Sequence, residues 1–184
     1  LSVTGLTTGV TYYYRVRATN ENCISGNSST ATVTTLLIVP DIDVSGNGTL
    51  IADGDVTPSV TDHTDFGSVG LIGSNLVRTF TITNDGNATL TLENVAISGT
   101  HATNFVVIAQ PSLSLVVGSS TTFQVRFDPS TTGVHSASVI ITNNVSGKNP
   151  YNFSIQGTGM AAGIMRNPTS IVFNAIVGAT PASS

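Results

Sequence analysis

Residues 78–92 read RTFTITNDGNATLTL, and this stretch decides the fold class. Threonines alternate with Phe80 and Ile82, residues 84–87 (Asn-Asp-Gly-Asn) interrupt the pattern, and Leu90 and Leu92 then resume it. A two-residue period of β-branched and aromatic residues is typical of a half-buried strand, and Asp-Gly is a common hairpin turn. The stretch therefore predicts a β-hairpin with one face in water, and Val95 and Ile97 are expected to extend its second strand.

Similar short strand patterns recur along the chain, with Gly, Asn, Ser or Pro between them. They lie at residues 66–70, 105–109, 113–117, 121–129, 134–142 and 151–155. In the fourth of these, Phe123, Val125 and Phe127 share one face and are expected to be core residues. Short strands at this spacing, without any helical period, predict an all-β chain built of immunoglobulin-like β-sandwiches.

The composition excludes several classes of partner. Only 9% of the residues are charged, so the surface must be rich in hydroxyl and amide groups. Six Lys and Arg with a net charge of -4 provide no basic patch, which argues against nucleic acid as a partner. The longest apolar run, residues 36–39, is far shorter than the ~20 residues of a membrane span, so we expect no direct membrane insertion.

The N-terminal residues 1–36 have a pattern of their own. A strand is expected at 12–18, with Tyr12, Tyr14, Val16 and Ala18 on one face, and a second strand at 30–35. Gly5, Leu6, Gly9, Tyr12, Val16 and Ala18 follow the spacing of the C-terminal strands of a fibronectin type III domain, with Thr8 where that family usually has Pro. This stretch resembles that family, and the resemblance implies that the Tyr12 hydroxyl bonds back to nearby backbone.

Five short segments between Pro40 and Gly159 carry a second resemblance. They are DGDVTPS at 53–59, TDFGSV at 64–69, FTI-x-N-x-G at 80–86, F-x-V-x-F-x-P at 123–129, and NPY-x-F-x-I-x-G at 149–157. Together they resemble the choice-of-anchor D modules of secreted bacterial proteins, which are relatives of the ASH/hydin and major-sperm-protein immunoglobulin-like domains. The resemblance implies an architectural domain without catalytic residues, in a secreted or cell-surface protein.

These patterns predict tandem immunoglobulin-like sandwiches, one complete and flanked by two partial ones. Residues 1–36 are expected to be the C-terminal part of a fibronectin type III-like domain, and residues 37–159 the complete sandwich. Residues 160–184 are expected to hold a linker and the first strand of a further sandwich, starting near Pro168. Such an arrangement is typical of a repeat-type protein.

Four acidic residues, Asp53, Asp55, Asp62 and Asp65, lie in a stretch predicted to be one long loop, residues 46–65. Carboxylates and backbone carbonyls are the ligands that Ca²⁺ prefers, so the loop is a candidate calcium site, and Ca²⁺ is the one candidate cofactor. Asp side chains also cap turns by accepting hydrogen bonds from backbone N–H groups. The sequence leaves both alternatives open.

No other residues suggest chemistry. His63, His101 and His135 are scattered without metal-ligand spacing and are expected to be solvated. Cys23 is the only cysteine, so it is either a thiol without a partner or one whose partner lies outside this sequence. No nucleophile motif or paired-carboxylate cleft is predicted, and the chain is expected to be non-enzymatic.

We therefore expect a structural spacer in a long extracellular or cell-surface protein, which supports adhesion or the display of other domains. Its expected partners are neighbouring domains of the same polypeptide, with other surface proteins or glycans as further candidates. Two alternatives remain open: a sandwich that binds carbohydrate or protein through loop 46–65, and a filament subunit joined by strand donation. Residues 169–177 have the extended, apolar pattern of a donated strand.

Overall fold

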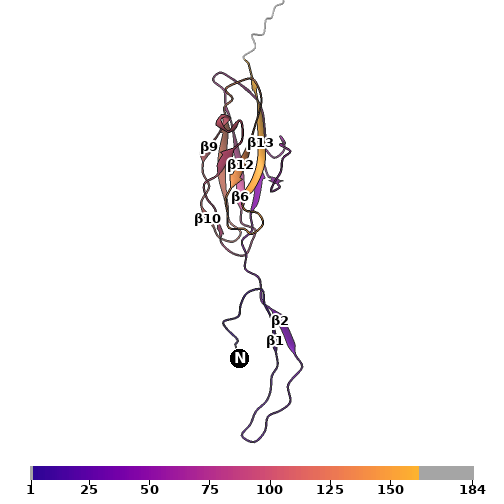
Figure 1. Ribbon diagram of the computed structural model, residues 1–184. Coiled ribbons are helices and arrows are strands. Elements are labelled where there is room, and N and C mark those ends of the chain that lie inside the picture. Colours follow the sequence, from indigo (N-terminus) through magenta and orange to yellow (C-terminus); the bar gives the residue numbers. More distant parts are fainter. Residues whose placement is uncertain (1, 162–184) are drawn as a thin grey trace, which may run out of the picture.

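The computed structural model describes residues 2–161, which form a small N-terminal hairpin and a larger β-sandwich (Figure 1). β1 (Thr11–Tyr14) and β2 (Ala31–Thr34) make the hairpin. The elements of the sandwich are β3 (Asp43–Gly46), β4 (Thr49–Ile51), β5 (Asp65–Gly70), β6 (Leu76–Thr83), β7 (Leu90–Thr91), β8 (Ala96–Ser98), the 3₁₀ turn η1 (Ala102–Asn104), β9 (Phe105–Ala109), β10 (Ser114–Leu115), β11 (Ser120–Phe127), β12 (Gly133–Ile141) and β13 (Tyr151–Met160).

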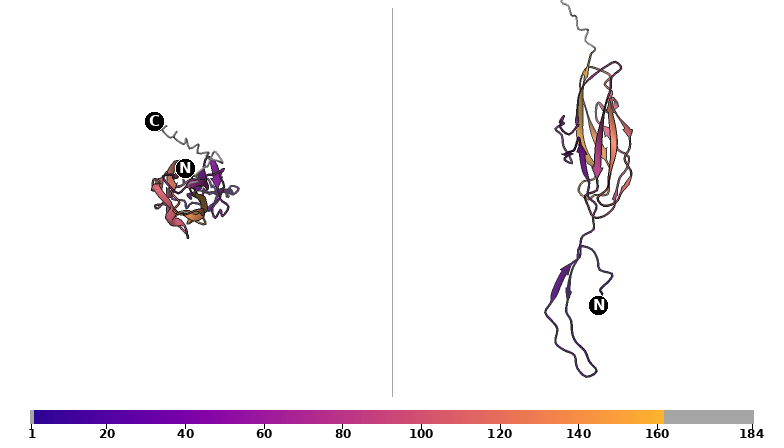
Figure 2. Two further views of the ribbon diagram at one scale, coloured as in Figure 1. Left: turned by 90° about the horizontal axis from the view of Figure 1, so that it is seen from above. Right: turned by 180° about the vertical axis from the view of Figure 1, so that it is seen from behind.

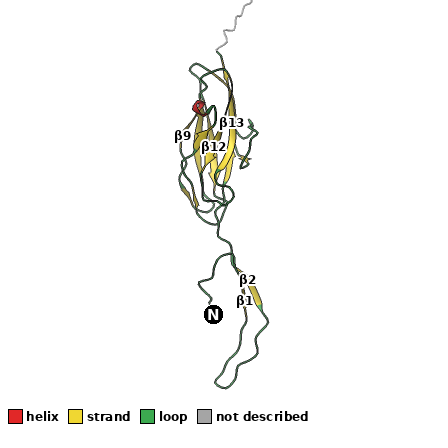
Figure 3. Ribbon diagram, viewed as in Figure 1, coloured by secondary structure: helices red, strands yellow, loops and turns green. Residues whose placement is uncertain are grey.

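Two main sheets face each other in the sandwich (Figures 2 and 3). One has the strand order β4-β3-β6-β11-β9 and the other the order β5-β13-β12-β8, while β7 pairs separately with β10. All of these pairs are antiparallel except β5 with β13. The described chain is therefore all-β, with the architecture of an immunoglobulin-like sandwich, as the sequence predicts. No helix among the described residues has the length and apolarity needed to cross a membrane.

Alternate residues of each strand enter the space between the sheets. Phe123, Val125 and Phe127 are all 0% exposed, which confirms the predicted core face of β11. The ring of Phe127 stacks on Phe105 with a centroid distance of 4.7 Å and lies 5.9 Å from that of Phe66. Gly157 on β13 lies directly against the Phe127 ring, because any Cβ at this position would overlap it. The two sheets therefore pack closely at this point, because the Phe127 ring of one sheet fills the space that a side chain at Gly157 on the other would need.

The hairpin predicted at residues 78–92 is wrong. β6 pairs with β3 and β11, whereas β7 pairs with β10, so the two predicted strands are not neighbours. The reason lies in Asn84, which is fully buried and donates from Nδ2 to the carbonyls of Ala88 (2.8 Å) and Leu115 (3.0 Å). These bonds tie the chain to the β10 segment, and they lead β7 away from β6.

A true Asn-Gly hairpin lies instead within the stretch that the sequence predicts to be a loop. Asn47 and Gly48 have φ values of 51° and 75° and join β3 to β4. Positive φ at both central residues suits the right-handed twist of paired strands. Two further expectations need correction: Ala96–Ser98 pairs with β12 and does not extend the predicted hairpin, and the last strand continues to Met160.

The N-terminal hairpin is shorter than predicted, and only Tyr12 and Tyr14 of its two strands are partly buried. Tyr12 pairs with Val33, and the Tyr12 hydroxyl accepts a 2.8 Å hydrogen bond from the Thr7 N–H, which confirms the predicted bond to nearby backbone. β1 ends at Tyr14, and Val16 beyond it is 72% exposed. The predicted strand near Pro168 and the candidate donor segment 169–177 lie outside the described residues.

We predict that Phe127→Ala lowers the free energy of unfolding of the sandwich by about 3–5 kcal/mol, because it removes a fully buried ring and leaves a cavity between the sheets. Chemical denaturation followed by circular dichroism would measure the loss. Val77→Ala, on the outer face of β6 and 38% exposed, is the matched control and should cost well under half as much. Equal losses for the two variants would contradict the packing described above.

Candidate functional site

The four aspartates of residues 46–65 each accept hydrogen bonds within the protein. The Asp55 carboxylate accepts from the Thr57 N–H at 2.8 Å and from its hydroxyl at 2.6 Å. Asp62 does the same for Thr64, at 3.0 and 2.6 Å, and it is only 6% exposed. This is the side-chain geometry of a turn in which Asp caps the residue two positions on. The bonds from Thr57 also hold the pKa of Asp55 below its ordinary value.

The other two aspartates bind the neighbouring strand β13. Asp53 accepts from the Asn152 N–H at 2.9 Å, and Asp65 accepts from the Gln156 side-chain amide at 2.8 Å. Asp65 also caps its own turn through the Gly67 N–H at 2.7 Å. The four carboxylates are therefore used at separate places along the loop, and they stabilise its course beside β13.

No group of three or more His, Cys, Asp or Glu side chains within residues 2–161 is arranged to hold a metal ion. Each of these carboxylates already accepts at least one hydrogen bond that holds the loop to itself or to β13. Of the two alternatives that the sequence leaves open, this geometry supports the capping of turns.

One histidine departs from the expectation that all three are solvated. His135 is only 3% exposed, because the alternation of β12 turns it toward the core, where it lies 5.9 Å from the Phe127 ring. Its Nε2 lies 2.8 Å from the Thr131 carbonyl oxygen, and its ring meets that of His101 edge to face at 5.2 Å. His63 is half-buried, and burial lowers its pKa. We find no partner set that would give these rings a catalytic role.

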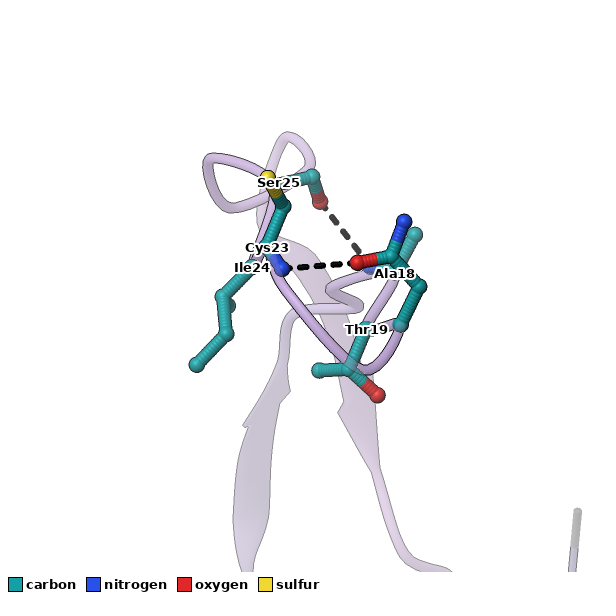
Figure 4. A pocket seen from close by; sticks show the side chains of 6 residues that line it. Ala18, Thr19, Cys23, Ile24 and Ser25 are labelled. Atoms are coloured by element: carbon teal, nitrogen blue, oxygen red, sulfur yellow. Dashed lines mark hydrogen bonds between the residues drawn. The ribbon is translucent and has the colours of Figure 1, made fainter.

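A hollow at the tip of the N-terminal hairpin is lined by Ala18, Thr19, Asn20, Cys23, Ile24 and Ser25 (Figure 4). The Asn20 side-chain oxygen accepts from the Cys23 N–H at 2.7 Å, and the Ser25 hydroxyl accepts from the Ala18 N–H at 2.9 Å. All six lining residues belong to one exposed loop, and Cys23 is a free thiol. Apart from the Cys23 thiol, these six residues offer no acid or base, because neither a carboxylate nor an imidazole is among them.

The most specific polar contacts lie where the chain passes from the hairpin into the sandwich. We call residues 37–41, with the turn 84–87 and Lys148, the lower joint. Asn87 makes three hydrogen bonds to this linker: its N–H donates to the Val39 carbonyl (2.9 Å), its Oδ1 accepts from the Val39 N–H (2.7 Å), and its Nδ2 donates to the Leu37 carbonyl (2.9 Å). The backbone and side chain of Asn87 thus bind the linker through hydrogen bonds like those of a paired strand.

Two further residues complete the lower joint. Gly86 lies against the backbone of residues 39–41, so closely that a Cβ would overlap the linker. The Lys148 ammonium donates to the Asp41 carboxylate at 2.7 Å and to the Ile42 carbonyl at 3.1 Å. This hydrogen bond raises the pKa of Lys148 and lowers that of Asp41. The linker is therefore hydrogen-bonded to the sandwich at Leu37, Val39, Asp41 and Ile42.

Beside the lower joint, the Tyr151 hydroxyl donates to the Ile51 carbonyl and is buried. Burial, with smaller contributions from Asp53 and Asp43, raises the pKa of Tyr151 to about 12. A phenol held neutral in this way is a structural hydrogen-bond donor and a poor general base. The Tyr151 hydrogen bond links the start of β13 to the end of β4.

We predict that calcium leaves the thermal stability of the chain unchanged, so that melting temperatures agree between millimolar CaCl₂ and excess chelator. By contrast, Asp62→Ala should cost about 1–3 kcal/mol in either condition, because it leaves the buried Thr64 N–H without its acceptor. Asp128→Ala, at an exposed position outside the loop, is the control and should cost little. Calcium-dependent stabilisation that Asp53→Asn with Asp55→Asn removes would show that the loop is a metal site after all.

Comparisons with known proteins agree with this architecture. The model of the HYDIN/CFA65/VesB-like, Ig-like domain family matches residues 59–158. A search of the curated proteins finds no match.

Among solved structures, three similar ones illustrate the range. A protein of unknown function from Porphyromonas gingivalis W83 is 14% identical, with a TM-score of 0.47 and coverage of 86% of this chain and 70% of that one. The Vibrio cholerae VesB protease is 15% identical, with a TM-score of 0.39 and coverage of 65% and 31%. The ASH/PapD-like domain 7 of human CEP192 is 11% identical, with a TM-score of 0.32 and coverage of 52% and 80%.

The family match spans more than half of the chain and lies within the sandwich, where it covers β5 to β12 and most of β13. Its start, Ser59, lies in the capped loop, and its end, Thr158, lies in the last strand. The chain belongs to the HYDIN/CFA65/VesB-like Ig-like domain family.

Proposed function

We propose that this chain is a non-enzymatic spacer segment of a secreted or cell-surface multidomain protein, and that its sandwich holds neighbouring domains at a set angle. The observation that carries the proposal is the lower joint. A flexible tether needs no hydrogen bonds to the domain. This linker makes them at Leu37 and Val39, which bind Asn87, and at Asp41, which binds Lys148. Such bonds stabilise one orientation of the segment that enters the sandwich.

The family supports a structural role for the sandwich. We also propose that the sandwich is a choice-of-anchor D module and that the protein lies outside the cell. The rival role as a ligand-binding domain through loop 46–65 has less support, because the four aspartates of that loop already bind backbone and side-chain donors. Function is then carried by the two ends of the sandwich, where other domains attach.

The N-terminal hairpin fits the same proposal as the last strands of a fibronectin type III domain. Its Tyr12 hydroxyl makes the bond that this resemblance implies. Val16 and Val33 are 72% and 52% exposed, and a two-stranded hairpin is marginally stable by itself. We propose that further strands of the same polypeptide cover this face.

To test the lower joint, ¹⁵N relaxation would be measured at the amides of residues 37–39 and 41, since Pro40 has no N–H. We predict backbone order parameters near the ~0.85 of a rigid strand, and a fall below about 0.6 in Asn87→Ala, because that change removes two of the three bonds to the linker. Asn94→Ala, an exposed asparagine outside the joint, is the control. Low order parameters in the unaltered protein would defeat the proposal of a set angle.

To test whether further strands cover the N-terminal hairpin, hydrogen exchange would be followed at the amides of β1 and β2. We predict fast exchange in residues 1–184 and slow exchange once the preceding sequence of the natural polypeptide is added. Slow exchange in a monomer of residues 1–184 would refute the need for any cover. Protection that grows with protein concentration would instead indicate strand donation between copies.

A further inference from the structure

β13 ends at the end of the sandwich that lies opposite the N-terminal hairpin (Figure 1), and three exposed apolar residues belong to the segments that meet there. Ile72 is 81% exposed, Val134 is 62% exposed and Met160 is 52% exposed. They come from the β5–β6 turn, the start of β12 and the end of β13. We call these three residues the upper patch.

The strand register brings the upper patch together. Val134 pairs with Thr158, which places it diagonally across from Met160, and such neighbours on one face of a sheet lie within reach of each other. Met160 pairs on its other side with Gly70, and its carbonyl accepts from the Leu71 N–H at 3.0 Å. Ile72 follows directly. Val134 and Met160 therefore lie on one surface, and Ile72 lies in the turn beside the end of β13.

The surroundings of the upper patch are uncharged. Residues 67–77, 129–134 and 157–161 contain no Lys, Arg, Asp or Glu. Contiguous apolar surface on a soluble protein commonly marks a contact with another segment or molecule. A charged side chain would gain no ion pair here, so the residues that contact the upper patch should be apolar.

The chain itself supplies a segment of this kind. β13 ends at Met160, in the middle of the patch, and Ile164 and Met165 follow four and five residues later. A chain spans about 3.3–3.6 Å per residue at most, so these two side chains can reach every part of the patch without leaving the end of the sandwich. Their tether also makes the local concentration far higher than that of any second copy.

The other end of the sandwich shows the same arrangement in place. Three residues after β2, the Leu37 side chain folds back over Gly9 of the N-terminal hairpin, where a Cβ would meet Leu37 Cδ1 at 3.0 Å. An apolar linker residue thus packs on the domain that precedes it. Each linker has two adjacent apolar residues ahead of a proline. In the first linker they are Ile38 and Val39, directly before Pro40. In the second they are Ile164 and Met165, with two residues between them and Pro168.

We propose that the upper patch is the docking surface for Ile164 and Met165, and that this contact sets the orientation of the segment that follows residue 161. The inference rests on the proposed role as a spacer and identifies the surface through which the sandwich holds its C-terminal neighbour. It assigns the same function to both ends: a linker is bound before the next domain begins.

The test uses residues 1–184 and hydrogen exchange at the amides of 163–166. We expect exchange roughly tenfold slower than for a free peptide of this sequence, and loss of that protection in Ile72→Ser with Met160→Ser. Leu50→Ser, at an apolar position 69% exposed on β4 and away from the patch, is the matched control and should leave the protection unchanged. Reciprocally, Ile164→Ser with Met165→Ser should shift the methyl resonances of Ile72, Val134 and Met160.

Free-peptide exchange rates at 163–166 in the unaltered protein would overturn the proposal, as would protection that survives the patch variant. Methyl shifts that depend on protein concentration would assign the patch to a second copy and likewise overturn it. All of these readouts concern residues at the upper end. The order parameters of residues 37–41 test the lower joint separately, so failure of this inference is distinguishable from failure of the proposed function.

Discussion

The packing of six phenylalanines between the two sheets is the interaction on which the rest of the structure depends. They form two groups, one around Phe127 with Phe66 and Phe105, the other around Phe80 with Phe123 and Phe153. With so few charged residues, the chain has little ionic interaction to draw on, and burial of these rings is its main source of stability. Gly157 is part of the same packing, since the Phe127 ring occupies the space of its missing side chain.

Because aromatic rings fill the core, polar residues determine the structure at the ends and edges of the sandwich. Asn84 is the clearest case, because its fully buried amide joins the end of β6 to the β10 segment and directs the chain into the turn 84–87. That turn then presents Gly86 and Asn87 to the linker. A buried amide that is fully bonded specifies one geometry, since any other would leave its polar atoms unpaired. The lower joint is thus a direct extension of the core.

The two ends of the sandwich differ in chemistry but have the same role in our proposal. The lower joint uses hydrogen bonds and the Lys148–Asp41 ion pair, which is partly exposed and contributes orientation more than stability. The upper patch is apolar and uncharged. The loop rich in aspartates, which the sequence singles out as a candidate ligand site, instead serves to cap turns and to bind β13.

Which side chains face inward follows from the sequence, since strand alternation is a local property and holds whatever the strand pairs with. Phe123, Val125 and Phe127 follow from it, as do the class of fold and the bond to the Tyr12 hydroxyl that the family resemblance implied. Only the tertiary structure decided which strands are neighbours. The Asp-Gly turn at 85–86 looked like a hairpin, but Asn84 binds a carbonyl 31 residues further along, and that contact separates β6 from β7. The bonds that join Asp53 and Asp65 to β13 are equally non-local, because their partners Asn152 and Gln156 lie 99 and 91 residues further along the chain.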